Sequence, residues 1–86
     1  MPRLSEFYGI VVYMYFGDHL PPHVHAIYGS DEAVVRISDG AILRGGLPRT
    51  AARLMREWVG LHREELEANW QRAQRPEPLV PVAPLR

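Results

Sequence analysis

The apolar residues near the start of the chain follow the two-residue repeat of a β-strand. Aromatic and β-branched residues dominate positions 7–16, and both alternating faces of this segment are apolar. A strand that is apolar on both faces is typical of the centre of a sheet covered on both sides. We therefore predict one long strand here, with a second cover supplied by the C-terminal tail or by another subunit.

Three shorter strands are predicted to follow, at residues 23–28, 32–37 and 41–44. Short turns separate them, at Gly29-Ser30-Asp31 and at Ser38-Asp39-Gly40, and Gly45-Gly46 ends the last one. Connections this short join antiparallel neighbours, because a parallel crossover needs about a dozen residues. The pattern therefore predicts an antiparallel meander of about four strands.

The apolar spacing changes to that of a helix after Pro48. Apolar side chains then recur three or four positions apart as far as Ala73. Gly60 interrupts the pattern at a cost of ~1 kcal/mol relative to alanine, but no capping residue beside it starts a new helix. We predict one helix from Pro48 to about Gln74, which at ~40 Å would cross the whole sheet or project beyond it. A projecting end would offer Trp70 to a partner.

Prolines recur every two or three positions in residues 76–86, which excludes a helix or a central strand there. This tail is expected to be extended, with its apolar side chains docked on the core or on a second copy, or offered as a P-x-x-P ligand. The predicted fold class is α+β: an antiparallel β-meander packed against one long C-terminal helix. Residues 1–75 form the single domain, and residues 76–86 form the extended Pro-rich tail.

Composition narrows the possible environments. The chain has 86 residues, a formal net charge of zero and no cysteine. No overall field attracts it to nucleic acid or to anionic lipid. No apolar run approaches the ~18 residues of a membrane span, and no secretory leader opens the sequence. We expect a cytoplasmic protein without membrane contact, and its neutrality favours a homodimer or another partner.

Three of the four histidines fall close together, in the segment from Asp18 to His25. His23 and His25 are two positions apart on a predicted strand, so they share a face with Cα atoms ~6.6 Å apart. His19 comes from a loop that the Pro21-Pro22 pair restrains. With Asp18 as a fourth ligand or as an orienting acceptor, these side chains predict a site for a divalent transition metal such as zinc.

Two alternatives to a metal stay open for these histidines. They can hydrogen-bond to the loop and pack against a nearby tyrosine. His19, His23 and His25 can also act as metal-free acid–base catalysts, because imidazole titrates near neutral pH. His62, on the predicted helix, is a more distant ligand candidate.

Arginines form a second group of candidates. Arg49, Arg53 and Arg56 lie at helical spacing, and Arg44 precedes them. Guanidinium groups bind phosphate in a two-point geometry, so together with Trp70 they are candidates for a phosphate or partner contact. Several glutamates on the same helix dilute this charge, which makes RNA an unfavoured but open partner.

Several short motifs resemble a bacterial family, domain of unknown function family 4160. They include Asp18-His19 and Pro21-Pro22-His23-Val24-His25-Ala26 in the loop and strand, and Glu57-Trp58 and Asn69-Trp70 in the helix. The resemblance implies a small intracellular prokaryotic protein, often encoded beside another small protein in a toxin–antitoxin-like pair. It carries over Asp18, His19, His23 and His25 as the candidate site, whereas Gly60 is atypical for the family.

Three functions are consistent with these observations. The first is a protein-binding component of a two-gene toxin–antitoxin-like module, with a small protein partner encoded nearby. The second is a histidine-dependent hydrolase or ribonuclease-like toxin, with or without a metal. The third is a metal-binding domain built on the histidine cluster.

Overall fold

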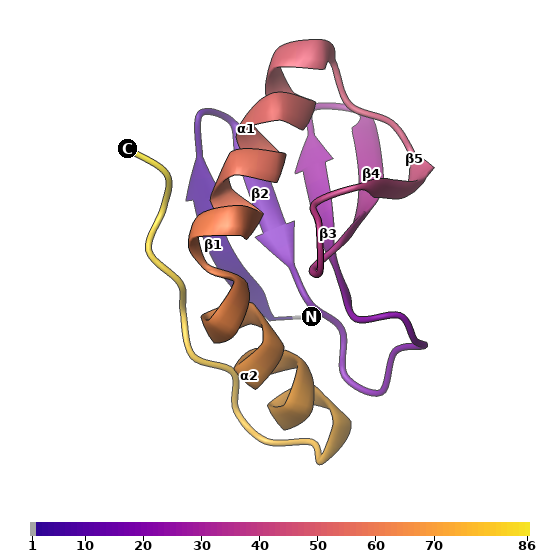
Figure 1. Cartoon of the computed structure of the whole chain (residues 1–86), viewed down its shortest axis with the longest axis vertical. Helices are drawn as coiled ribbons and strands as arrows, with labels where there is room; N and C mark the ends of the chain where they lie inside the picture. The colour runs from indigo at the N-terminus through magenta and orange to yellow at the C-terminus, as the bar shows by residue number, and fades with distance from the viewer. Residues whose placement is uncertain (1) are drawn as a thin grey trace.

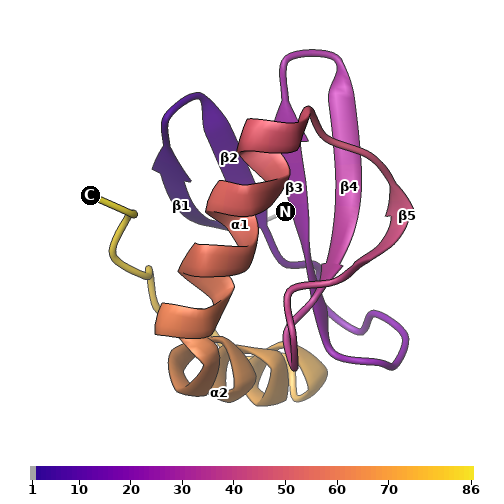
Figure 2. The same ribbon diagram turned by 45° about the horizontal axis from the view of Figure 1, so that its top comes forward.

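The computed structural model describes residues 2–86 and shows a five-stranded antiparallel sheet, with one helix against one face and a second helix across one end of the sheet (Figure 1 and Figure 2). The strands are ordered β1-β2-β3-β4-β5, so each pairs with its neighbour in sequence. The α+β class and the meander are confirmed, but with five strands rather than four. Their bounds are β1 Arg3–Phe7, β2 Ile10–Tyr13, β3 His23–Tyr28, β4 Asp31–Arg36 and β5 Ile42–Gly45.

The prediction of one strand over residues 7–16 is wrong, because the chain reverses at Tyr8 and Gly9. These two residues have φ angles of 49° and 80°, and Phe7 pairs with Ile10 across them. Two successive positive φ values are typical of a two-residue hairpin turn, and glycine accommodates one of them without strain. The apolar residues on the two sides of the turn belong to two strands of one hairpin. Because the apolar pattern continues across the turn, it did not reveal the reversal.

The other strands lie close to their predicted positions. β3 has the predicted bounds, and β4 and β5 are each shifted by one residue. Val24 and Ala26 of β3 and Ala33 and Val35 of β4 are buried in the core beneath the helices. His23 and His25 alternate with these core residues, so the pleat turns their side chains to the opposite face of the sheet.

The single predicted helix is in fact two helices, α1 Arg49–Leu61 and α2 Arg63–Gln74. His62 between them has φ −118° and ψ 22°, outside the helical range, and the two axes meet at a steep angle (Figure 2). A straight helix of ~40 Å would exceed the longest dimension of the fold, 34 Å. Gly60, which disfavours helix, lies next to the break. Within residues 2–86, neither helix is long and apolar enough to cross a membrane.

Beyond Gln74 no helix or strand is formed, and the chain returns past β1 (Figure 1). The backbone N–H of Val82 donates to the Leu4 carbonyl at 2.9 Å, and the indole N–H of Trp58 donates to the Ala83 carbonyl at 2.8 Å. Val82 and Leu85 are part of the core, whereas Val80 is 51% exposed. The segment thus contacts both the first strand and the first helix.

Candidate metal centre

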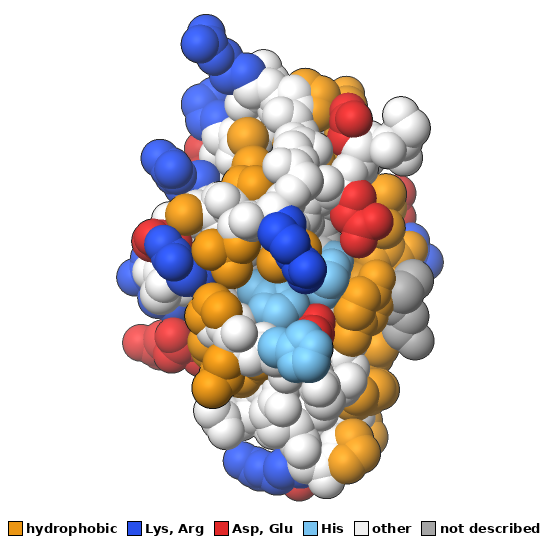
Figure 3. Space-filling model, turned by 90° about the vertical axis from the view of Figure 1, so that its right-hand side faces the viewer, with side chains coloured by type: hydrophobic (Ala, Val, Ile, Leu, Met, Phe, Trp, Pro, Cys, Tyr) orange, Lys and Arg blue, Asp and Glu red, His pale blue; other side chains and the backbone are white. Residues whose placement is uncertain are grey.

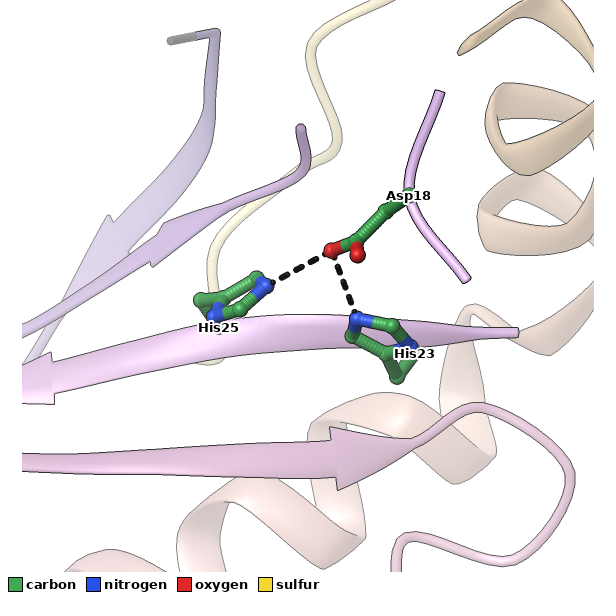
Figure 4. Close-up of side chains that lie close together, drawn as sticks. All are labelled: Asp18, His23 and His25. Atoms are coloured by element: carbon green, nitrogen blue, oxygen red, sulfur yellow. Dashed lines mark hydrogen bonds and ion pairs between the residues drawn. The ribbon is translucent and has the colours of Figure 1, made fainter. Parts of the chain in front are cut away.

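Three side chains converge at the start of β3. Asp18 lies in the loop between β2 and β3, and His23 and His25 lie two positions apart on β3. Both imidazoles point at the same carboxylate oxygen (Figure 4). The Nε2 atoms of His23 and His25 lie 2.8 and 3.1 Å from Asp18 Oδ2. One atom from each residue lies within 4.8 Å of the other two, which makes the three a candidate ligand set for a metal ion.

The cluster is largely shielded from water. The side chains of His23 and His25 are 5% and 8% exposed, and that of Asp18 is 17% exposed. Burial alone would raise the pKa of Asp18, but hydrogen bonds from His25, from the His19 backbone and from His23 outweigh it and lower the pKa to about 2. Asp18 is therefore a carboxylate at neutral pH, with acceptor oxygens only.

The second nitrogen of each imidazole faces another acceptor. His23 Nδ1 lies 2.7 Å from the Pro21 carbonyl, to which it donates. His25 Nδ1 is buried without a hydrogen-bond partner among residues 2–86, and its nearest acid is Glu32 Oε2 at 3.6 Å. Glu32 is absent from the predicted site. The alternation of residues 32–37 turns Glu32 away from the core, and the observed register, which pairs Ile27 with Glu32, places it diagonally across from His25 on the same face.

Aromatic rings hold both imidazoles in place. Tyr15 lies against His25 with ring centroids 4.1 Å apart, and Trp70 lies 5.1 Å from His23. Burial raises the pKa of the Tyr15 hydroxyl, and the carboxylates of Glu32 and Asp18 add to the effect. Trp70 is only 3% exposed. It therefore supports the cluster and, contrary to prediction, offers almost no surface to a partner.

His19 does not join the other histidines, so the prediction of three converging imidazoles is wrong. Its backbone N–H donates to Asp18 Oδ1 at 2.8 Å, while its side chain is exposed. The loop thus uses the main chain of His19, not its imidazole, to position the carboxylate. His62 lies elsewhere, where its Nδ1 is 2.7 Å from Glu65 and its ring packs on Trp58.

A surface depression of about 330 Å³ borders the cluster. Its lining includes Asp18, His19, His23 and Arg44, with Leu20, Pro21, Val34 and Leu43 as the apolar part. Figure 3 shows the histidines gathered on this face with a carboxylate between them and an arginine beside them.

The predicted arginine group divides into separate places. Arg44 borders the depression beside the histidines, whereas Arg53 and Arg56 line a different hollow with Gly40 and Ile42. Arg49 is exposed at the start of α1. The four do not form one phosphate-binding surface around the histidines.

The sequence profile of the domain of unknown function DUF4160 matches residues 9–71. The chain belongs to this family. The DUF4160 match covers the three converging residues, Arg44 and Trp70, and ends before the C-terminal segment. The resemblance inferred from the motifs is thereby confirmed, and it names no reaction. No match was found among curated proteins or among solved structures.

Proposed function

We propose that this DUF4160 protein binds a divalent transition metal through Asp18, His23 and His25. The observation that carries the proposal is the direct approach of both imidazole Nε2 atoms to one carboxylate oxygen. In His23, the carbonyl of Pro21 requires the ring proton on Nδ1, which leaves a lone pair on Nε2 of the neutral ring. That lone pair faces the ionised carboxylate of Asp18, and two acceptors repel each other unless a cation lies between them.

The cation is either a second proton on the imidazole or a metal ion, and three features support the metal. First, two ligand atoms bound at ~2.0–2.1 Å to one ion lie about 2.9–3.4 Å apart for right-angled to tetrahedral geometry. The separations here are 3.1 Å, inside this range, and 2.8 Å, just below it, so an ion fits with little movement of the ligands. Both values are also normal N–H···O hydrogen-bond lengths. Second, His25 Nε2 approaches the same oxygen as His23 Nε2, so one ion at this point can be reached by both rings and by the carboxylate. The second proton is an alternative for His23 alone, because the Nδ1 of His25 has no acceptor within hydrogen-bond distance among the described residues and the neutral ring can donate from Nε2.

The third feature is the surroundings of the ligands. Metal-bound histidines usually donate their other ring N–H to a carbonyl or a carboxylate, which fixes the orientation of the ring. Pro21 supplies that carbonyl to His23, and Glu32 supplies a carboxylate near the otherwise unpartnered Nδ1 of His25. The backbone N–H of His19 completes the support by holding the second oxygen of Asp18.

Two imidazoles and one carboxylate suit zinc, iron(II) and similar ions, and three protein ligands leave positions for water or substrate. Such an ion polarises bound oxygen atoms and lowers the pKa of bound water. The hydrolase that the sequence leaves open as an alternative would therefore take its metal-dependent form, with the depression beside Asp18 as the place where substrate enters.

The test is metal titration of chelator-treated protein with Zn²⁺ and Co²⁺, followed by calorimetry and by thermal unfolding. We expect one equivalent to bind. At a free metal concentration of 100 times Kd, the added stability is ~2.7 kcal/mol, which raises the Tm of a domain this small by roughly 10–20 °C.

Variants identify the ligands. We expect His23→Gln and His25→Gln to abolish stoichiometric binding, whereas His19→Ala and His62→Ala, which remove imidazoles outside the cluster, bind as the parent does. Circular dichroism of each metal-free variant checks that it is folded. The proposal would be contradicted if the folded parent bound no stoichiometric metal. It would also be contradicted if His19→Ala lost metal binding as completely as His23→Gln and His25→Gln.

A protein partner in a two-gene module is a separate proposal. Eight large hydrophobic side chains of residues 2–86 are exposed, and the most exposed are Leu20, Leu61 and Tyr8, at 77%, 66% and 61%. Co-expression with the neighbouring gene and co-purification would test it. A monomeric chain that purifies alone would refute it.

A further inference from the structure

The strand register places one arginine in line with the metal-binding face. His25 of β3 pairs with Val34 of β4, and Val34 pairs with Arg44 of β5. Residues directly opposite each other in antiparallel strands point to the same face of the sheet. His25, Val34 and Arg44 therefore form a row, with Arg44 about 10 Å from His25 at two strand spacings.

An arginine side chain is long enough to cover most of that distance. Arg44 borders the same depression as Asp18, His19 and His23. Arg44 is exposed, and its guanidinium group has no hydrogen bond or ion pair with another of the described residues 2–86. Its guanidinium group thus has all its donors available at the edge of the depression.

We infer that the depression binds an organic oxyanion, with one oxygen on the metal and another on the guanidinium group of Arg44. This inference rests on the proposed metal site. A metal ion held by a single carboxylate and two neutral imidazoles keeps net positive charge, and Arg44 adds a second positive group across Val34. Guanidinium binds carboxylate and phosphate in a two-point geometry, so both anion types fit this pair of charges.

The apolar side chains that line the depression indicate what the uncharged part of the ligand is. Val34 is buried at the floor, and Leu20 and Leu43 are 77% and 36% exposed around the depression. Apolar side chains that flank an anion site favour a ligand whose charged group carries an apolar substituent. A bare inorganic anion would leave these side chains in water.

The experiment uses the full chain loaded with Co²⁺, whose visible spectrum changes when an anion enters its coordination shell. Phenyl phosphate and benzoate are the probes for the two oxyanion types, inorganic phosphate lacks the apolar group, and benzyl alcohol lacks the charge. We expect one of the two aromatic anions to shift the spectrum at lower concentration than inorganic phosphate, and benzyl alcohol to leave it unchanged. The tighter of the two identifies the class of anion.

Substitution of Arg44 separates this inference from the metal site itself. Arg44→Gln should bind Co²⁺ as the parent does. Its affinity for the anion should fall by about tenfold or more, since a charge-assisted hydrogen bond is lost. Arg49→Gln, which removes an exposed arginine at the start of α1, should change neither. Normal metal binding with no anion response, or with equal anion affinity in Arg44→Gln, would overturn the inference and leave the metal site standing. Failure of the parent to bind Co²⁺ would overturn both.

Discussion

Removal of the Asp18 carboxylate tests the electrostatics of the cluster in the metal-free protein. Asp18 accepts hydrogen bonds from two imidazoles and from the His19 backbone, and its pKa falls from an ordinary value of 3.8 to about 2. A lowered pKa means that folding favours the ionised carboxylate. The stabilisation is therefore complete above about pH 4 and is lost as the pH falls through 2.

The size of the effect follows from the shift. Nearly two pKa units at 1.36 kcal/mol each give about 2 kcal/mol, and partial access of water reduces the expected value to about 1–2 kcal/mol. A domain of this length is stable by roughly 5–10 kcal/mol, so Asp18→Ala should fold and show a clear deficit near pH 7.

Urea unfolding in the presence of a chelator, repeated between pH 7 and pH 2, measures this deficit. We expect the difference in unfolding free energy between the parent and Asp18→Ala to be largest above pH 4. This difference should shrink by about 1–2 kcal/mol towards pH 2. Asp31→Ala, at an exposed position at the start of β4, should give a small gap with little dependence on pH. A gap for Asp18→Ala that stays constant from pH 5 to pH 2 would refute the reasoning.

Two further substitutions test how the fold holds its C-terminal segment and its last strand. Asn69→Ala should lower the free energy of unfolding by about 1–2 kcal/mol, because the buried Asn69 amide bonds both the N–H and the carbonyl of Val80 and water at the half-exposed Val80 replaces only part of this bonding. An unchanged urea midpoint would contradict this. Gly45→Ala should lower the free energy of unfolding by more than about 2 kcal/mol, since a Cβ at this φ of 72° would collide with the Glu32 carbonyl. Gly46→Ala has open space around the new Cβ, so its unfolding free energy should stay within about 0.5 kcal/mol of the parent's. Similar thermal unfolding temperatures for the two alanine variants would rule out the collision.

The hydrophobic pattern predicted which residues are buried better than it predicted where the chain changes direction. β3 was located to the residue, because turn residues flank an alternating segment. The two errors fall near Gly9 and Gly60, each inside an apolar pattern that continues on both sides. Burial is a property of each side chain, so the pattern persists across a hairpin turn or a helix break. At position 9 the glycine itself was the available signal, because glycine accommodates the positive φ that this turn requires.

The candidate site was partly predictable for a related reason. The two-residue period of a strand is enough to place His23 and His25 on one face, and both lie there. The side-chain direction of a loop residue follows no such period, so proximity in sequence said nothing about His19, which turns to the surface. Asp18 joins the cluster through three hydrogen bonds, and these depend on how the whole loop folds back over β3.

Arg44 illustrates what only the three-dimensional pairing supplies. By sequence it belongs with the arginines of the following helix, yet pairing across three strands aligns it with His25 instead. This alignment depends on the irregular register between Val34 and Val35, where β4 and β5 pair. Because side chains alternate along a strand, a shift of one residue in β5 would turn Arg44 to the helix-covered face and remove it from the depression.

Gly45 follows Arg44 directly and packs against the Glu32 backbone, where no side chain fits. The glycine thus fixes the register that presents the arginine, so any substitution that displaces β5 should weaken anion binding while leaving the three metal ligands in place.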